Sequence, residues 1–244
     1  MIGPPAEILL VTPVWNDSSR LTGFGAELAK ALADSPLSVH WIIADDGSGP
    51  DERAPLQALE DAFARMFPRV QLHFAARHYG KGAVVREAWA LRPDATWLAF
   101  VDADGSVSPS EILRLIRAAV ESDISVLGIR KRTATTQFVE SPWRGIFHQG
   151  FLLAVHWMLD LQCQDPQCGA KILRGSDYRH IAPQLFENGF AFDSELLCAL
   201  KHEGAEWLEM PVSWIEKSGG KVRPLHDAWG MFVALLRIRK RLRY

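Results

Sequence analysis

Cysteine is scarce in this sequence of 244 residues, which contains only Cys163, Cys168 and Cys198. Three is an odd number and too few for a disulfide framework in a chain of this length, so we expect reduced thiols in an intracellular setting. A structural zinc is not expected either, because no His/Cys pair completes a tetrahedral ligand set with Cys163 and Cys168.

Long apolar runs and a basic leader are also missing. Stretches such as 97–101 and 231–236 are far shorter than the ~20 apolar residues that a membrane-spanning helix requires. No basic residue precedes the apolar run 8–11, so the N-terminus lacks the pattern of a signal peptide. These absences predict a cytoplasmic protein that does not cross a membrane by itself, with peripheral contact at the cytoplasmic face left open.

A large excess of one sign of charge is absent when the chain is taken as a whole, but not when it is divided into regions. The formal net charge of -2 and the pI near 6.4 give no reason to expect a nucleic acid partner. However, residues 219–244 carry seven Lys/Arg against one Asp, a charge of +6, whereas the other 218 residues carry -8. An acidic body with a basic C-terminal segment therefore needs an explanation.

Short apolar runs alternate with helical patterns in the first half of the chain. Strands are expected at 8–14, 38–44, 70–75, 96–101 and 124–129, and helices at 21–33, 55–67, 82–91 and 109–121. This alternation is typical of an α/β domain with a mostly parallel central sheet, in which ligands bind at the carboxyl ends of the strands. The second half is less regular, with helices expected at 143–161, 175–188, 192–203 and 227–243, an extended segment at 165–173 and a strand at 206–215.

No linker or repeat divides the chain, so a single domain is expected over residues 1–228. Residues 229–244 are expected to form a basic amphipathic C-terminal helix that either belongs to this domain or contacts a membrane.

Two carboxylates follow the apolar run 96–101 at once, in the sequence Asp102-Ala-Asp104-Gly. Hard oxygen ligands on such a turn suit Mg²⁺ or Mn²⁺, which complete their shells with water and phosphate oxygens. A solvated acidic turn is the alternative. The position directly after a buried strand favours the metal site, because folding does not require carboxylates there.

Two other strand ends are polar. Asp45-Asp46-Gly-Ser could be a turn, or could accept hydrogen bonds from a base or a ribose. Gly80-Lys81-Gly82 opens a helix and offers backbone N–H groups and an ammonium to phosphate, although it lacks the Walker spacing.

Together these segments resemble a known family. Thr-Pro-Val-Trp-Asn-Asp (12–17), Asp-Asp-Gly-Ser (45–48), Gly-Lys-Gly-Ala (80–83) and Asp-Ala-Asp-Gly (102–105) are similar to GT-A glycosyltransferases of family 2. Later blocks at 165–171, 189–197 and 212–222 are similar to those of the dolichyl- or polyprenyl-phosphate sugar transferases. The resemblance covers about residues 6–228, and it implies a GT-A, Rossmann-like fold.

The resemblance also implies roles for individual residues. The nucleotide-sugar site would contain Pro13, Trp15, Asp17, Asp45, Asp46, Lys81, Asp102 and Gln167. Asp102 and Asp104 would hold the metal, Arg130 would serve the acceptor phosphate with Arg132 and Arg144 as weaker candidates, and Lys171, Asp193 and Glu195 would complete the catalytic side. Trp15 and Asp17 stand where the family usually has Tyr and Glu, and Ala170 and Gly220 replace a usual Phe and Ser, which affects the expected acceptor shape more than the catalysis.

The implied reaction is an inverting hexosyl transfer from a nucleotide sugar to a polyprenyl phosphate. The Gly-Lys-Gly turn and Phe-Asp-Ser-Glu (192–195) are closer to the glucosyl than to the mannosyl members, so UDP-glucose is expected before GDP-mannose. A lipid phosphate is already an anionic nucleophile, whereas a hydroxyl acceptor would need a base such as Asp193 or Glu195. These two acids could instead be helix N-terminal residues favoured by the helix dipole.

Two alternatives stay open at this point. The chain could use a soluble or glycan hydroxyl acceptor with the same donor, or it could be a non-catalytic nucleotide-sugar-binding partner. The segment 230–244 mixes apolar and basic residues, so its helix could lie in the headgroup plane of a membrane, or it could dock on the acidic body. The sequence gives no oligomeric state.

Overall fold

The computed structural model describes residues 7–139, 142–217 and 224–242. Its main sheet has seven strands in the order β3-β2-β1-β4-β7-β5-β8. Their bounds are β1 (Ile8–Val14), β2 (Val39–Asp45), β3 (Val70–Phe74), β4 (Trp97–Val101), β5 (Ser125–Arg130), β7 (Ala170–Arg174) and β8 (Trp207–Val212). All neighbouring strands run parallel except β7, which is antiparallel to β4 and β5. The expectation of a mostly parallel α/β sheet is therefore confirmed.

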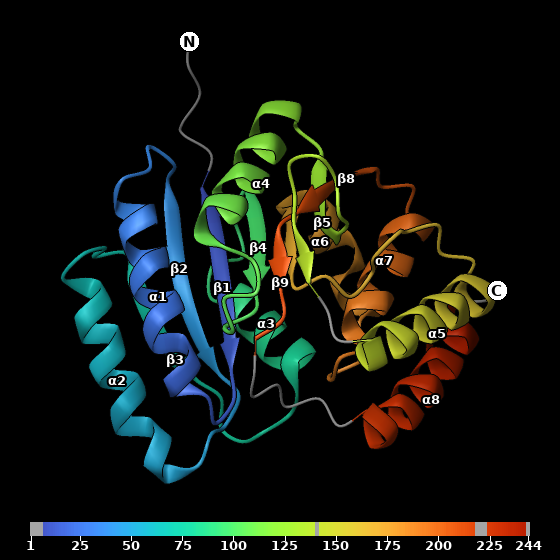
Figure 1. Ribbon diagram of the computed structural model, residues 1–244, viewed down its shortest axis with the longest axis horizontal. Helices are drawn as coiled ribbons and strands as arrows, with labels where there is room; N and C mark the ends of the chain where they lie inside the picture. The colour runs from blue at the N-terminus through green and yellow to red at the C-terminus, as the bar shows by residue number, and fades with distance from the viewer. Residues whose placement is uncertain (1–6, 140–141, 218–223, 243–244) are drawn as a thin grey trace.

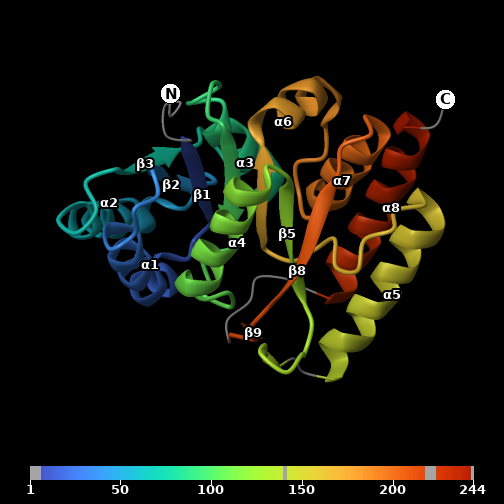
Figure 2. The same ribbon diagram turned by 90° about the horizontal axis from the view of Figure 1, so that it is seen from above.

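Helices cover both faces of this sheet (Figures 1 and 2). One apolar cluster joins the sheet to α1 (Ser18–Ala33), α2 (Pro50–Ala64) and α4 (Pro109–Ser122). A second cluster, on the other face, joins it to α3 (Lys81–Trp89), α6 (Gly175–Ile181) and α7 (Phe192–His202). Because both faces are covered, the strands are almost entirely apolar, as in β4, whose five residues are all buried.

The strand order creates a switch point between β1 and β4. The chain builds outward from β1 through β2 to β3, and then returns to place β4 on the other side of β1. The helix α3, which connects β3 to β4, lies on the face opposite to α1 and α2, and β1 and β4 end side by side at this reversal. In sheets of this type ligands bind in a crevice at the carboxyl ends of the strands on either side of such a switch point. The arrowheads of β1 and β2 mark this edge at the bottom of Figure 1.

The antiparallel strand β7 brings a distant segment to the same edge. Its register pairs Phe100 with Lys171 and Val101 with Ala170, and the Asp102 amide donates to the Gly169 carbonyl at 2.9 Å. Because β7 enters the sheet where β4 leaves it, the residues before β7 meet the turn after β4. The sequence predicted an extended segment here but not its direction.

Several expected elements have different bounds in the structure. Helix α2 begins at Pro50 rather than at 55, because Pro50 occupies its first turn and Pro55 lies inside it. The helix expected at 175–188 ends at Ile181, where a short 3₁₀ turn (Ala182–Gln184) containing Pro183 follows. The strand expected at 206–215 is divided into β8 and β9 (Trp214–Ile215), and β9 pairs with the short β6 (Phe138–Val139).

The C-terminal helix docks on the body. Helices α5 (Pro142–Leu159) and α8 (Pro224–Leu242) lie side by side at the right of Figure 1, next to α7. Ala234, Leu235 and Ile238 of α8 are buried in the second apolar cluster. Within the described part of the chain, no helix has the length and apolarity needed to cross a membrane.

Candidate active site

The turn after β4 carries the two aspartates expected to bind a metal. The side chains of Asp102 and Asp104 are 41% and 22% exposed, so both carboxylates are accessible from the crevice. Oδ1 of Asp104 accepts a hydrogen bond from the Ser106 amide at 2.8 Å, which fixes the turn. A Cβ on Gly169 would lie 1.8 Å from Oδ2 of Asp102, so only glycine leaves room for this carboxylate.

Lys81 joins this turn to α7. It is the first residue of α3, and its Nζ lies 2.9 Å from Oδ1 of Asp102 and 3.3 Å from Oδ2 of Asp193. Burial by itself would lower the pKa of Lys81, but the two carboxylates outweigh it and raise this pKa above its usual value. Lys81 is therefore a fixed positive charge next to Asp102.

A second lysine lies deeper on the same carboxylate. Lys171 is fully buried, and its Nζ donates to Oδ1 of Asp193 at 2.6 Å and to the Cys168 carbonyl at 2.7 Å. The Phe100 ring lies 4.8 Å from Nζ of Lys81 and 5.2 Å from Nζ of Lys171, measured to its centroid. Asp193 thus has an ammonium group on each oxygen, and it anchors both lysines rather than presenting a free base.

Glu195 points elsewhere. Its Oε2 accepts hydrogen bonds from the Phe186 and Glu187 amides at 2.9 and 2.7 Å, and its Oε1 lies 3.3 Å from Arg241 of α8. Residues two apart on an α-helix point in nearly opposite directions, which divides Glu195 from Asp193. Burial raises the pKa of Glu195. Glu195 therefore holds the loop before α7 and does not share a centre with Asp193, and a catalytic role for these two acids stays a prediction.

The end of β2 has structural partners. Both Asp45 and Asp46 are at most 3% exposed. Asp45 accepts hydrogen bonds from the amide and the hydroxyl of Ser48. Asp46 accepts from the amides of Tyr79 and Gly80, both at 2.8 Å. These carboxylates build the loops at the crevice, and direct contact with a nucleotide stays a prediction for them.

The Gly80-Lys81-Gly82 turn is also explained by packing. Gly80 has a φ of 117°, and a Cβ on it would lie 2.5 Å from the Asn188 carbonyl oxygen. A Cβ on Gly82 would lie 2.3 Å from Cβ of Phe192. The Gly80 amide, which we expected to be available to phosphate, is occupied by Asp46. The glycines therefore allow α3 to approach the segment 187–192, and Lys81 is the residue of this turn that carries charge into the crevice.

The loop after β1 presents an aromatic surface. Trp15, 37% exposed, stacks on His78 with ring centroids 4.1 Å apart and an interplanar angle of 16°. Nδ1 of His78 lies 2.8 Å from Oδ2 of Asp46, which holds the imidazole in this position. Pro13 is partly buried in β1, directly before this surface.

Asp17, at the start of α1, is linked to the turn after β4 through an arginine that the sequence reasoning missed. Nε of Arg20 lies 2.6 Å from Oδ2 of Asp17, and Nη1 lies 3.9 Å from Oδ2 of Asp104. The hydrogen bond with Asp17 raises the pKa of Arg20. The spacing of three residues from Asp17 in a first helical turn was the signal that could have found it.

The arginine expected to bind the acceptor phosphate is paired inside the protein. Nε and Nη2 of Arg130 lie 2.7 and 2.8 Å from the two oxygens of Asp165, and the Arg130 side chain is only 8% exposed. Nε2 of His148 lies 3.3 Å from Oδ1 of Asp165. Burial would raise the pKa of Asp165, but Arg130 and His148 hold it well below the usual range. His148 was another residue that the sequence reasoning missed.

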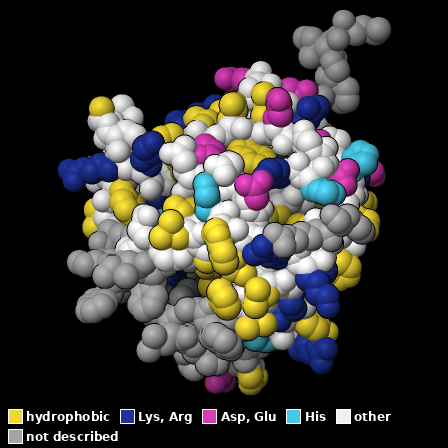
Figure 3. All heavy atoms as spheres, turned by 90° about the vertical axis from the view of Figure 1, so that its right-hand side faces the viewer, with side chains coloured by type: hydrophobic (Ala, Val, Ile, Leu, Met, Phe, Trp, Pro, Cys, Tyr) yellow, Lys and Arg dark blue, Asp and Glu magenta, His cyan; other side chains and the backbone are white. Residues whose placement is uncertain are grey.

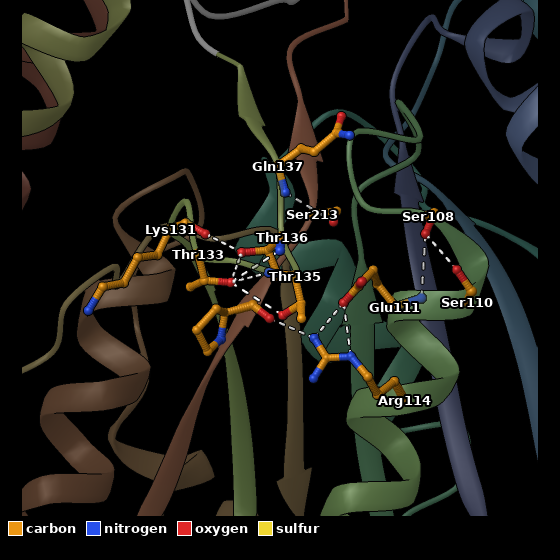
Figure 4. A network of polar contacts seen from close by, with 11 residues as sticks. Ser108, Ser110, Glu111, Arg114, Lys131, Thr133, Thr135, Thr136, Gln137 and Ser213 are labelled. Atoms are coloured by element: carbon orange, nitrogen blue, oxygen red, sulfur yellow. Dashed lines mark hydrogen bonds and ion pairs between the residues drawn. The ribbon is translucent and has the colours of Figure 1, made fainter.

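Arg132 and Arg144 are the other residues expected at the acceptor phosphate, and Gln167 is expected at the nucleotide sugar. Arg132 is exposed, in the loop after β5 that Figure 4 shows held by hydrogen bonds among Lys131, Thr133 and Thr136. The side chain of Arg144 lies outside the described residues. Gln167 is half-buried in the turn before Gly169.

The chain is similar in sequence to known glycosyltransferases along most of its length. The sequence model of the family Glycosyl transferase family 2 matches residues 10–171. The chain is 26% identical to dolichyl-phosphate beta-glucosyltransferase of Saccharomyces cerevisiae, covering 94% of this chain and 73% of that protein. It is 27% identical to the enzyme of that name in Dictyostelium discoideum, covering 95% and 73%. It is 26% identical to undecaprenyl-phosphate mannosyltransferase of Micrococcus luteus, covering 88% and 86%.

Solved structures share the fold. Mannosyl-3-phosphoglycerate synthase from Rubrobacter xylanophilus aligns with a TM-score of 0.69 at 16% identity, over 98% of this chain and 74% of that one. Glucosyl-3-phosphoglycerate synthase from Mycobacterium tuberculosis, in complex with Mg²⁺ and uridine diphosphate, aligns with a TM-score of 0.66 at 16% identity, over 96% and 79%. At this identity the likeness shows the fold alone, and the fold agrees with the expected GT-A arrangement.

Proposed function

The chain belongs to glycosyl transferase family 2, and from this premise we propose that it transfers a hexose from a nucleotide sugar to a polyprenyl phosphate, with inversion at the anomeric carbon. The observation that carries the proposal is the cluster of Asp102, Lys81 and Asp193 at the switch point of the sheet. The acceptor class is supported by the relatives that match almost the whole chain, which are named for dolichyl or undecaprenyl phosphate.

UDP-glucose is the donor that we propose first, with GDP-mannose second. The glucosyl relatives match along 94% and 95% of the chain, and one structural neighbour binds uridine diphosphate. We propose that the stacked rings of Trp15 and His78 support the base. Pro13, Asp17, Asp45, Asp46 and Gln167 then shape the donor pocket, mostly by holding the loops that surround it.

A divalent ion fits the residues present. Asp102 and Asp104 offer partly exposed carboxylate oxygens on one turn. Among the residues that the structure describes, no group of three or more His, Cys, Asp or Glu could hold a metal. We propose that diphosphate and water oxygens supply the remaining ligands, as they commonly do for Mg²⁺. We propose that these two aspartates hold Mg²⁺ or Mn²⁺. When bound, the ion would offset the charge that develops on the leaving diphosphate.

The chain's own residues supply positioning and charge. The ammonium of Lys81, held charged by Asp102 and Asp193, faces the leaving diphosphate from the first turn of α3. Asp193, fixed by Lys171, keeps this ammonium in place. The acceptor phosphate is an anion, so it attacks the anomeric carbon without giving up a proton, and the site has to orient it rather than activate it.

The acceptor side is proposed to use the loop after β5. Arg130 orders the start of this loop through Asp165, and Arg132 is the exposed arginine in it. A planar guanidinium suits a phosphate. A hydroxyl acceptor would instead need a general base. Asp193 and Glu195, the carboxylates expected for that task, are both engaged in other contacts, so this geometry favours the phosphate acceptor.

We also propose that α5 and α8 contact the surface of an anionic bilayer. On these helices Leu153 is 70% exposed, Trp157 80%, Phe232 40% and Leu236 48%. Figure 3 faces this side of the molecule, where hydrophobic side chains lie among basic ones. Because one face of α8 docks on the body and another stays exposed, docking and membrane contact are compatible. The +6 charge of residues 219–244 would be attracted to acidic headgroups.

The experiment that tests the proposed reaction is transfer of labelled hexose into a lipid phase. The purified chain is incubated with Mn²⁺, undecaprenyl or dolichyl phosphate, and labelled UDP-glucose or GDP-mannose. Label in the lipid fraction, dependent on acceptor and ion, is expected with UDP-glucose. Transfer only to water-soluble hydroxyl acceptors would overturn the acceptor, and a GDP-mannose preference would overturn only the donor.

A further inference from the structure

The loop 186–190 connects the C-terminal helix to the turn that carries Lys81. It lies between the 3₁₀ turn 182–184 and α7, and it contacts α3 on one side and α8 on the other. We infer that Glu187, in this loop, is a positioning residue for Lys81, and that α8 exerts its influence on the site through Glu187. The catalytic consequence of this inference rests on the proposed function, whereas the mechanical coupling does not.

On the side of α8, Glu187 is held by two arginines. Oε1 and Oε2 of Glu187 accept from Nε and Nη2 of Arg237 at 3.1 and 2.7 Å, and Nη2 of Arg241 also contacts Oε1. The Glu187 side chain is only 7% exposed. Hydrogen bonds between charged groups are about twice as strong as neutral ones, and a guanidinium that binds both oxygens also fixes the direction of the carboxylate.

The backbone of the same loop is held by α7. Oε2 of Glu195 accepts hydrogen bonds from the amides of Phe186 and Glu187, and Oε1 of Glu195 lies 3.3 Å from Nη2 of Arg241. Arg241 therefore bridges two acids, one in the loop and one in α7. Glu195 therefore holds the loop 186–190 in place, a role that its position in the sequence near Asp193 does not indicate.

On the side of α3, the loop is attached to the helix that begins with Lys81. Arg86 donates to the Glu187 carbonyl at 2.8 Å and to Oδ1 of Asn188 at 2.6 Å. The Ala83 amide donates to the Asn188 carbonyl at 3.1 Å. Gly80 and Gly82 have no space for a Cβ against Asn188 and Phe192. The first turn of α3 is therefore in direct backbone contact with the loop.

This continuity makes the position of Lys81 depend on Glu187. Close-packed backbone segments do not slide independently, so a shift of the loop moves the turn 80–82. The Lys81 ammonium lies at hydrogen-bonding distance from Asp102 and near that distance from Asp193, and a displacement of about 1 Å would weaken both contacts. The alternative is that Glu187 only fastens α8 to the body, with no effect on α3.

Measurements of hydrogen exchange and of nucleotide binding distinguish a positioning role of Glu187 from a role that is limited to fastening α8. The variants are Glu187→Gln and the double variant Arg237→Gln/Arg241→Gln, which removes the partners from the surface side and keeps the buried glutamate. The matched control is Glu111→Gln, because Glu111 also pairs with an arginine, Arg114, but on α4 (Figure 4). Exchange is measured on peptides covering 79–89, and UDP affinity is measured by calorimetry with Mn²⁺.

If Glu187 positions Lys81, the amides of residues 79–89 should exchange about tenfold faster in Glu187→Gln and in Arg237→Gln/Arg241→Gln than in the wild type. Both variants should also bind UDP more weakly, whereas the Glu111→Gln control should show neither change. Unchanged exchange in this segment, with a lower melting temperature only, would overturn the inference. If the wild-type chain fails to bind UDP, the proposed donor is wrong, but the exchange result still decides the coupling. If Glu187→Gln does not fold, the double arginine variant gives the same readout.

Discussion

The carboxylate of Asp102 lies directly against the Cα of Gly169, at a point where a Cβ would come within 1.8 Å of Oδ2. The Asp102 amide also donates to the Gly169 carbonyl at 2.9 Å. The antiparallel entry of β7 produces this contact between residues that are distant in the sequence. The crevice therefore depends on the absence of a side chain at position 169.

Gly169→Ala is expected to displace Asp102 while leaving the fold intact. The atom that must move is the end of a partly exposed side chain, so the loss of stability should stay within about 1–3 kcal/mol. Misplacement of a catalytic group by about 1 Å costs on the order of 100-fold in rate, so transfer should fall by that much. Urea unfolding and transfer assays measure the two quantities.

The matched control for this prediction is Gly23→Ala, in α1, where an added Cβ meets nothing within 4 Å. This change should leave the activity unaltered and stabilise the helix slightly. Full activity in Gly169→Ala would show that Asp102 does not need its present position.

Asp104→Ala is expected to abolish metal-dependent transfer. Loss of one of two carboxylate ligands should lower the rate by at least about 100-fold at a Mn²⁺ concentration that saturates the wild type. Chelation of the ion with EDTA should have a comparable effect on the wild type and little further effect on the variant. The exposed Asp94, replaced by Asn, serves as the control, and undiminished activity of Asp104→Ala would refute the metal assignment.

Lys171→Met tests the buried pair with Asp193. Removing one partner of a buried ion pair costs about 3–5 kcal/mol, and the lower end is expected because Lys81 still contacts Asp193. The double variant Lys171→Met/Asp193→Leu should recover part of this loss in denaturant unfolding, since no buried charge is then left unpaired. Transfer activity should not recover.

A lysine in an exposed pair provides the comparison. Lys201 contacts Asp160 at 2.9 Å, with side chains 41% and 86% exposed, so Lys201→Met should hardly change the stability. Equal destabilisation by the two lysine variants would contradict the structural role given to Lys171.

The Asp165–Arg130 pair predicts a dependence of stability on pH. The folded pKa of Asp165 lies below its unfolded value of about 3.9. As the pH falls, the unfolded state therefore takes up a proton on Asp165 before the folded state does. The stabilisation is fully present well above the unfolded pKa, and it is lost as the pH falls from that pKa toward the lower folded pKa. Unfolding free energies measured from pH 6 downward should fall more steeply for the wild type than for Asp165→Asn. Parallel curves for the two proteins would contradict the assignment.

Vesicle binding tests the exposed face of α8. Phe232→Ser/Leu236→Ser removes two exposed apolar side chains, each worth about 1.5–3 kcal/mol when fully buried, so partitioning should weaken at least tenfold. The assay is co-sedimentation with vesicles of phosphatidylcholine and phosphatidylserine. Leu91→Ser, at an exposed leucine between α3 and β4, is the control and should bind like the wild type. Equal binding of all three proteins would count against this surface.

Local patterns were enough to predict much of the fold. The alternation of apolar runs and helical patterns located β1 to β5 and α1 to α4, because each depends on residues a few positions apart. The sequence failed where a distant partner decides. The helix expected through 188 ends at 181, and the following loop bonds instead to α3, α7 and α8. The direction of β7 likewise depends on pairing with strands far away in the chain.

By itself, the sequence determined that the chain is an α/β protein with acidic and lysine-bearing turns at the ends of its strands. Only the tertiary structure decided how these groups are paired. Asp193 lies between Lys81 and Lys171, whereas Glu195, two residues later, faces Arg241. The physical reason is that a buried charge must find a partner, and that partner is chosen by the direction in which each backbone element presents its side chains.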